Sequence, residues 1–102
     1  MERYNKKVTN WLYNSKGRPI AFKDGRNVFS RKGKFLGQIE GEDVWNGRYF
    51  ATIVDGDTIL CKLEPPGEPR SAPAPPGAPL TPGLPSDRAG KTLRGGYRDL
   101  SL

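Results

Sequence analysis

The sequence predicts a small all-β domain of quasi-repeated β-hairpins, followed by a proline-rich extended tail. Three observations predict this fold: a five-residue motif that recurs, turn-forming pairs at regular intervals, and the confinement of nearly all prolines to the later part of the chain. No window shows an apolar period of 3.6 residues, which argues against helices. With 102 residues, the chain has room for one small domain.

The recurring motif is a glycine, a basic residue, a variable residue, a bulky apolar residue and a final alanine or glycine. Its copies span residues 17–21, 33–37 and 47–51, so the glycines lie 33 − 17 = 16 and 47 − 33 = 14 residues apart. A unit of about 14 to 16 residues suits a β-hairpin with its linking turn and is too short for a βαβ unit. Residues 4–7 resemble residues 13–16, which directly precede the first copy, and indicate a degenerate further copy in which Val8 replaces the glycine.

Turn-forming pairs separate the copies and set the expected strand boundaries. An acidic residue followed by glycine returns the chain for the next strand. These pairs are Asp24-Gly25, Glu40-Gly41 and Asp55-Gly56. We therefore expect strands near residues 10–13, 18–23, 27–30, 34–40, 43–45, 48–54 and 57–63.

Strict alternation along a strand sorts the residues of each motif onto two faces. One face carries the basic and the bulky apolar residues: Arg18, Lys34, Arg48, Ile20, Leu36 and Phe50. The other carries the variable and the small residues: Pro19, Phe35, Tyr49, Ala21, Gly37 and Ala51. Because a small residue repeated at one strand position suggests close approach of neighbouring units, we expect the small residues near the centre of the domain.

Four stretches of the chain resemble a known family. They are Tyr-Asn-Ser-Lys-Gly at residues 13–17, Asp-Gly at 24–25, Gly-Lys-Phe-Leu-Gly at 33–37 and Val-Trp-Asn-Gly at 44–47. Residues 1–63 thereby resemble the four-fold β-flower domain, a small bacterial module. The resemblance implies about four hairpins around a pseudo-four-fold axis, and a proline-rich extension with a short C-terminal segment. It implies no established activity, substrate or catalytic residue.

Composition divides the chain into three regions, because nine of the ten prolines lie at or after Pro65. Residues 1–63 form the expected hairpin domain. Residues 64–89 are expected to be a polyproline II or disordered linker, since most of the prolines recur three apart and polyproline II has three residues per turn. The spacing of Arg70, Pro73 and Pro76 also matches a pattern that SH3 domains bind.

Residues 90–102 form a short C-terminal segment that regains apolar side chains. A linker normally separates two parts that matter, so this segment is a candidate docking peptide for a partner. A frayed chain end is the default interpretation. The candidate docking residues are Tyr97, Leu100 and Leu102.

The sequence lacks the residues that most catalytic and metal sites need. Histidine is absent, which removes the usual general base and most zinc sites. The single Cys61 cannot form an internal disulfide, and we expect it to pack as a small hydrophobic residue. We therefore expect no enzymatic activity, no cofactor and no metal site.

One segment resembles a metal-binding stretch of another family. Residues 53–59, Ile-Val-Asp-Gly-Asp-Thr-Ile, resemble a segment of the staphylococcal nuclease family in which an aspartate helps to bind a metal. That family also needs an arginine-containing strand and an acidic pair soon afterwards, whereas this chain continues into Glu64 and two prolines. We expect a hairpin turn here.

The sequence also limits where the protein is expected to act. No apolar run approaches the length of a membrane helix, and no apolar segment follows the first residues as it does in a secretory signal. We therefore expect a cytoplasmic protein without membrane contact. The oligomeric state is left open.

Charge supplies the second functional hypothesis. The chain carries 17 basic and 11 acidic residues, a formal net charge of +6. Basic residues cluster at the expected hairpin turns and would form a rim: Lys16, Arg18, Arg31, Lys32, Lys34 and Arg48. The primary hypothesis is a non-enzymatic binding or scaffold module for a protein partner, with the tail as tether. The alternative is a weak nucleic-acid binder, in which the rim contacts phosphates and neighbouring aromatic residues stack on bases.

Overall fold

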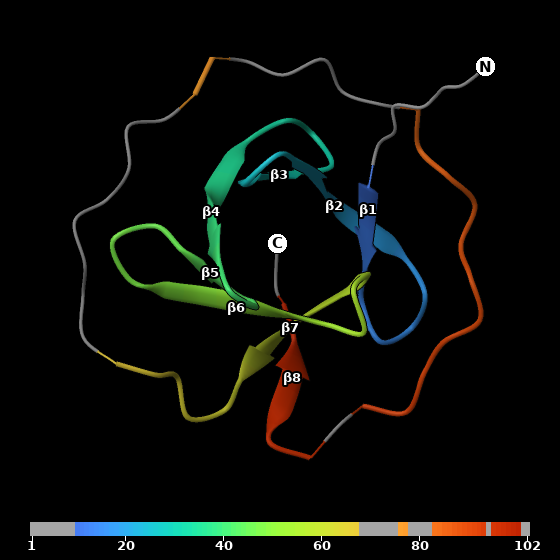
Figure 1. Ribbon diagram of the computed structural model, residues 1–102. Helices are drawn as coiled ribbons and strands as arrows, with labels where there is room; N and C mark the ends of the chain where they lie inside the picture. Colours follow the sequence, from blue (N-terminus) through green and yellow to red (C-terminus); the bar gives the residue numbers. More distant parts are fainter. Residues whose placement is uncertain (1–9, 68–75, 78–82, 94, 101–102) are drawn as a thin grey trace.

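The computed structural model describes residues 10–67, 76–77, 83–93 and 95–100. These residues contain no helix, so the all-β prediction is confirmed. The strands pair in chain order, and a contact between the first and the seventh closes the sheet (Figure 1). They are β1 (Asn10–Tyr13), β2 (Pro19–Asp24), β3 (Asn27–Ser30), β4 (Phe35–Glu40), β5 (Asp43–Trp45), β6 (Tyr49–Val54), β7 (Thr58–Lys62) and β8 (Tyr97–Asp99).

The first three hairpins, β1–β2, β3–β4 and β5–β6, share one irregularity. In each, the register shifts next to the turn and leaves one residue of the second strand without a partner in the first. The unpaired residues are Ile20, Leu36 and Phe50. Such a β-bulge bends the strand and ends its strict alternation.

Because of the bulges, the predicted separation of bulky and small residues onto opposite faces is wrong. Leu36 belongs to the same buried cluster as Ala21 and Ala51, and Ile20 and Phe50 pack against that cluster. The sheet therefore directs both residue types of the motif toward one core.

This central cluster draws residues from all of β1–β7. Its members are Leu12, Ala21, Val28, Leu36, Val44, Ala51, Ile53 and Ile59. A Cβ added at Gly37 would lie 2.6 Å from the carbonyl oxygen of Trp45, so only glycine fits there. The prediction that the small residues lie near the centre is confirmed, since Ala21 and Ala51 are fully buried.

A second cluster is aromatic and joins the first two hairpins. Trp11, Phe22 and Phe29 form it, with Tyr13 and Phe35 packed against it. The ring of Phe22 lies 5.4 Å from those of both Trp11 and Phe29, between centroids. Elsewhere in the sheet Cys61 is buried and free of any disulfide, as predicted for a packed thiol.

Strand β8 comes from far along the chain and completes the fourth hairpin. It pairs antiparallel with β7, and the N–H of Leu63 donates to the carbonyl oxygen of Gly96 at 2.8 Å. Figure 1 shows β8 directed toward the centre of the molecule, where Leu100 packs against the central cluster. The four hairpins surround this centre, as expected for a pseudo-four-fold arrangement. The expected further copy at residues 4–7 lies outside the described residues.

The Asp99 side chain closes the ring between the fourth and the first hairpins. Between the first and second hairpins, the N–H of Arg31 donates to the carbonyl oxygen of Ile20 at 3.1 Å. Ser15 stands 31 − 15 = 16 residues earlier, and its N–H donates instead to Oδ1 of Asp99 at 2.8 Å. The Ser15 hydroxyl donates to Oδ2 at 2.6 Å. A carboxylate thus takes the place of the backbone acceptor that is used between the first and second hairpins.

We expect Asp99→Ala to lower the free energy of unfolding by about 1.5–3 kcal/mol, because two donors of buried Ser15 lose a charged acceptor. Urea unfolding followed by tryptophan fluorescence measures the change. Asp87→Ala is the control, since this exposed carboxylate only approaches Arg18 at 3.9 Å and should contribute little. Equal losses in the two variants would contradict the ring-closing role of Asp99.

Candidate functional site

Three turns at the tips of the first three hairpins carry the basic residues expected to contact the phosphates of a nucleic acid. We call them the outer turns: residues 14–18, 30–34 and 46–48. In the first two, the side-chain oxygens of Asn14 and Ser30 accept hydrogen bonds from the N–H groups two and four residues later, at 2.9–3.3 Å. Side chains that bond to nearby backbone in this way fix the shape of a turn. The first two outer turns therefore share one backbone form.

All six predicted contact residues lie on the outer turns and are exposed. They are Lys16, Arg18, Arg31, Lys32, Lys34 and Arg48. Figure 1 shows the turns of the first and third hairpins pointing away from the centre on opposite sides. The cations are therefore spread around the perimeter and form no single compact patch.

The charges of the outer turns are largely uncompensated within the described part of the chain. Arg18 lies 3.9 Å from Asp87, and the other five cations make no ion pair with a described residue. Exposed carboxylates lie instead on the turns that connect successive hairpins: Asp24, Glu40, Glu42 and Asp55. The outer turns thus form a basic rim, separated from the acidic turns.

The aromatic residues near the rim are engaged in packing. Phe29 and Trp45 are 2% and 6% exposed, and Tyr13 and Tyr49 are half-buried. The ring of Trp45 meets that of Tyr49 edge-on at 5.9 Å. The rim therefore offers charge but little aromatic surface on which a base could stack.

Residues 83–93, which we call the strap, pack against the first hairpin. The N–H of Arg88 donates to the carbonyl oxygen of Gly17, and that of Lys91 to the carbonyl oxygen of Ser15, both at 2.7 Å. A Cβ on Gly17 would lie 1.9 Å from the carbonyl oxygen of Arg88, so the strap requires glycine at this turn. Part of the predicted linker is thus held against the sheet.

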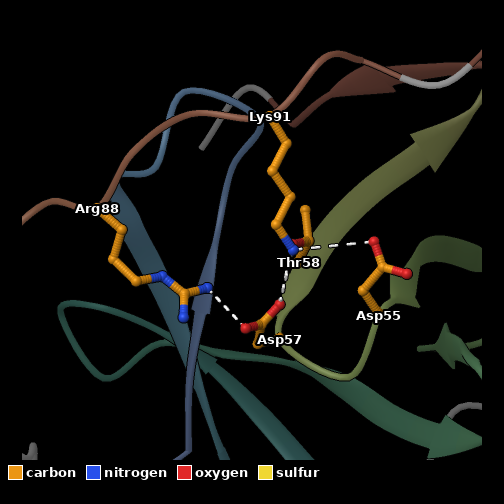
Figure 2. Close-up of polar contacts among 5 residues, drawn as sticks. All are labelled: Asp55, Asp57, Thr58, Arg88 and Lys91. Carbon is orange, nitrogen blue, oxygen red and sulfur yellow. Dashed lines mark hydrogen bonds and ion pairs between the residues drawn. The ribbon is translucent and has the colours of Figure 1, made fainter.

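The strap places two cations beside the turn between β6 and β7. Figure 2 shows Asp57 between them: Oδ2 lies 2.7 Å from Nη2 of Arg88, and Oδ1 lies 3.5 Å from Nζ of Lys91. Lys91 also lies 3.8 Å from Asp55. The guanidinium of Arg88 stands 3.6 Å from the centroid of the Tyr13 ring, a cation–π contact.

The nuclease-like segment is therefore part of an ion-pair cluster at a turn. Both of its aspartates face basic side chains of the strap. Among the residues that the structure describes, no group of three or more histidine, cysteine, aspartate or glutamate side chains could hold a metal ion.

The strap also sets the pKa of Asp57. Burial by itself raises this pKa, but hydrogen bonds from Arg88 and Thr58, together with the charges of Arg88 and Lys91, outweigh burial and lower it. Asp57 is therefore ionised throughout the neutral range and is a poor proton acceptor there.

A second polar network joins the third and fourth hairpins. The N–H of Lys62 donates to the Tyr49 hydroxyl at 2.9 Å, and this hydroxyl lies 2.6 Å from that of Thr52. Thr52 donates to Oδ1 of Asp43 at 2.7 Å, so Tyr49 must donate to Thr52. Burial raises the pKa of Tyr49, which keeps the phenol protonated and the network intact.

The family of this protein follows from a match along nearly the whole chain. A family model described as "4-fold beta flower protein" matches residues 3–98. The chain belongs to this family. The match reaches β8, beyond the residues 1–63 that carried the sequence resemblance, so the flower includes the C-terminal strand. No curated protein and no solved structure matches the chain. The family description names a fold and no activity.

The predicted docking residues lie partly within the flower itself. Tyr97 opens β8 opposite Lys62, and Leu100 packs against the central cluster. Leu102 lies outside the described residues. The division of the chain at residues 63 and 89 stays a prediction. No helix in the described part of the chain is long and apolar enough to cross a membrane.

Sequence reasoning missed β8, the strap and the partners of Asp57. The one signal for β8 is Gly95, which precedes Asp99 by four residues as Gly17 precedes Ala21. Asp99 pairs with Leu60 just as Ala21 pairs with Leu12. An aspartate in the position of a small residue hides this correspondence.

We expect Asp57→Asn to destabilise the flower by at most about 1 kcal/mol at neutral pH, because its ion pairs are partly exposed. The pKa of Asp57 is lowered in the folded state, so its contribution is complete above the unfolded value of about 3.9 and is lost as the pH falls through the folded value. The difference in unfolding midpoint between wild type and variant should therefore shrink as the pH falls below the unfolded value.

The matched control is Asp24→Asn, which changes an exposed turn carboxylate without an ion pair to a described residue. Thermal unfolding of both variants between pH 2 and pH 7 gives the comparison. A wild-type advantage over Asp57→Asn that grows toward acidic pH would contradict the lowered pKa.

Proposed function

We propose that this β-flower protein is a non-enzymatic binding module that presents its basic rim to an acidic surface of a protein partner. The observation that carries the proposal is the set of six exposed cations on the outer turns, five of which lie on the two turns whose backbone is fixed by the side chains of Asn14 and Ser30. A rigid platform binds with a smaller loss of conformational entropy than a flexible loop does. Charge complementarity then favours an acidic partner and speeds encounter with it.

The polar groups inside the flower support a role without acid–base chemistry. Asp57 has a lowered pKa and Tyr49 a raised one, so neither exchanges protons readily near neutral pH. The hydrogen-bond partners of both side chains come from the flower itself. These groups serve stability, and the exposed charges remain for recognition.

The proline-rich residues between β7 and the strap complete the proposal as a tether. Figure 1 shows residues 63–67, 76–77 and 83–93 at the periphery of the flower. Proline-rich chain is extended and semi-rigid, and here it links β7 to the strap and β8, the element that docks back on the sheet.

A weak nucleic-acid binder is the second candidate function, and the uncompensated charge of the rim favours it. Lysine and arginine side chains that face solvent can neutralise phosphates regardless of sequence. With the neighbouring aromatic rings packed inside, such binding would rest on phosphate contacts alone. It would therefore weaken steeply as salt is added.

We expect Lys34→Glu with Arg48→Glu to abolish capture of the partner from a nuclease-treated lysate of the source cells, because charge reversal repels an acidic surface. The matched control is Lys23→Glu with Arg26→Glu, which makes the same change in net charge on β2 and the turn after it. The control should capture the partner as wild type does. Capture of the same protein by the rim variant would contradict the proposal, as would an empty wild-type sample.

Fluorescence anisotropy with a single-stranded oligonucleotide tests the second candidate. Binding by wild type that is lost in the rim variant, and that falls as salt rises, would favour a nucleic-acid partner. Equal binding by the rim variant and its control would exclude the rim as the phosphate-binding surface.

A further inference from the structure

Strand β8 contacts the rest of the flower through a compact set of interactions. Its backbone pairs with Leu60, Cys61 and Lys62 of β7. Its carboxylate anchor, Asp99, takes two hydrogen bonds from Ser15. The residue that follows, Leu100, is partly buried and packs against the apolar side chains of the central cluster. Together, the backbone pairing with β7, the hydrogen-bonded carboxylate of Asp99 and the apolar side chain of Leu100 define a docking peptide and its site.

The strap adds a second set of contacts on the neighbouring surface. Arg88 and Lys91 bind Asp57 and donate backbone hydrogen bonds to the first outer turn. The indole N–H of Trp11 donates to the carbonyl oxygen of Gly83 at 3.0 Å. Residues 83–100 thus bind the first and fourth hairpins as one continuous element, apart from residue 94, which lies outside the described residues.

The connection that precedes this element differs from all the others in the sheet. The first three hairpins close through short turns, whereas residues 64–82 separate β7 from the strap and contain eight prolines. Proline-rich chain extends about 3.1 Å per residue, so these residues can span roughly 60 Å. That reach exceeds the longest extent of the molecule, 43 Å, so the connection can reach the docking site of a second copy.

The docking site itself is an open sheet edge when β8 is absent. β1 is paired with β7 at a single register position, Tyr13 opposite Thr58, and therefore leaves the rest of the β7 edge for β8. An unpaired strand edge is a template for another extended chain. Residues 83–100 of this same sequence fit the site, because they pair with this edge, accept the hydrogen bonds of Ser15 and place Leu100 against the central cluster.

We propose that two copies of this chain exchange residues 83–100, so that the strap and β8 of each copy complete the flower of the other. The segment makes the same contacts when it docks on its own flower and when it docks on that of a second copy. The balance between the two states therefore depends only on the connecting residues 64–82 and on the protein concentration. A flexibly linked segment has an effective concentration on the order of 1 mM, and exchange competes at protein concentrations of that order. Reciprocal exchange closes as a two-fold dimer. This inference does not depend on the proposed function of the rim.

The native Cys61 allows a direct test, because it lies opposite Arg98 across β7 and β8. Directly opposed residues of antiparallel strands have Cα atoms about 4.5–5.5 Å apart, within the range that a disulfide spans. Arg98→Cys should therefore form a disulfide with Cys61 wherever β8 is docked. The link lies within one chain when β8 docks on its own flower and joins two chains after exchange.

The full-length variant is unfolded in urea, refolded at about 10 μM, far below the expected effective concentration, or at about 1 mM, which is comparable to it, and then oxidised. We expect an internally linked monomer at the lower concentration and a substantial fraction of disulfide-linked dimer at the higher one. Mass spectrometry of a mixture of ¹⁵N-labelled and unlabelled chains should find Cys61 of one chain joined to position 98 of the other. Arg98→Ser, with Cys61 alone, is the control and should give no such dimer.

Internally linked monomers at both concentrations would overturn exchange, and so would dimers joined only through equivalent cysteines. If the variant forms no disulfide, light scattering on wild type decides the question. A wild type that remains monomeric after refolding at about 1 mM overturns the proposal. A dimer that forms only after refolding at that concentration supports it.

Discussion

The complete flower depends on the docking of β8 against β7, because the closing contact between β1 and β7 is a single residue pair and leaves the rest of the β7 edge open. Three hairpins are built from neighbouring strands, and the fourth is completed by a strand that returns after a long connection. Asp99 anchors this strand by giving Ser15 a side-chain acceptor, whereas the junction between the first and second hairpins uses a backbone carbonyl. Leu100, the next residue, packs against the central cluster.

The distribution of charged side chains follows the arrangement of the hairpins. The outer turns carry bases that face solvent, and the connecting turns carry carboxylates. The strap supplies cations to the acidic turn at Asp57, so this carboxylate is compensated by described residues, whereas most of the rim cations are not. The proposed recognition by the rim and the ion pairs of Asp57 therefore involve different charges, although Arg18 of the rim also approaches Asp87 of the strap.

The limits of sequence prediction here have physical causes. The positions of β1 to β7 follow from local turn chemistry and from the recurring motif, and the burial of Ala21, Gly37 and Ala51 follows from the repetition of small residues. Alternation failed at Leu36, because a bulge shifts the register without any distinctive residue type. The exposure of the rim cations followed from their turns, whereas the pairing of Asp57 with Arg88 spans 31 residues and has no local signal.

The sequence by itself determined the repeat, the all-β class, the first seven strands and the basic outer turns, since each depends on residues close together in the chain. Only the tertiary structure decided how the ring closes, which edge β8 occupies, and that the strap returns to the first hairpin. Those outcomes depend on backbone hydrogen bonds and on one carboxylate brought next to Ser15 from the far end of the chain. Contacts between such distant residues are set by the shape of the whole sheet.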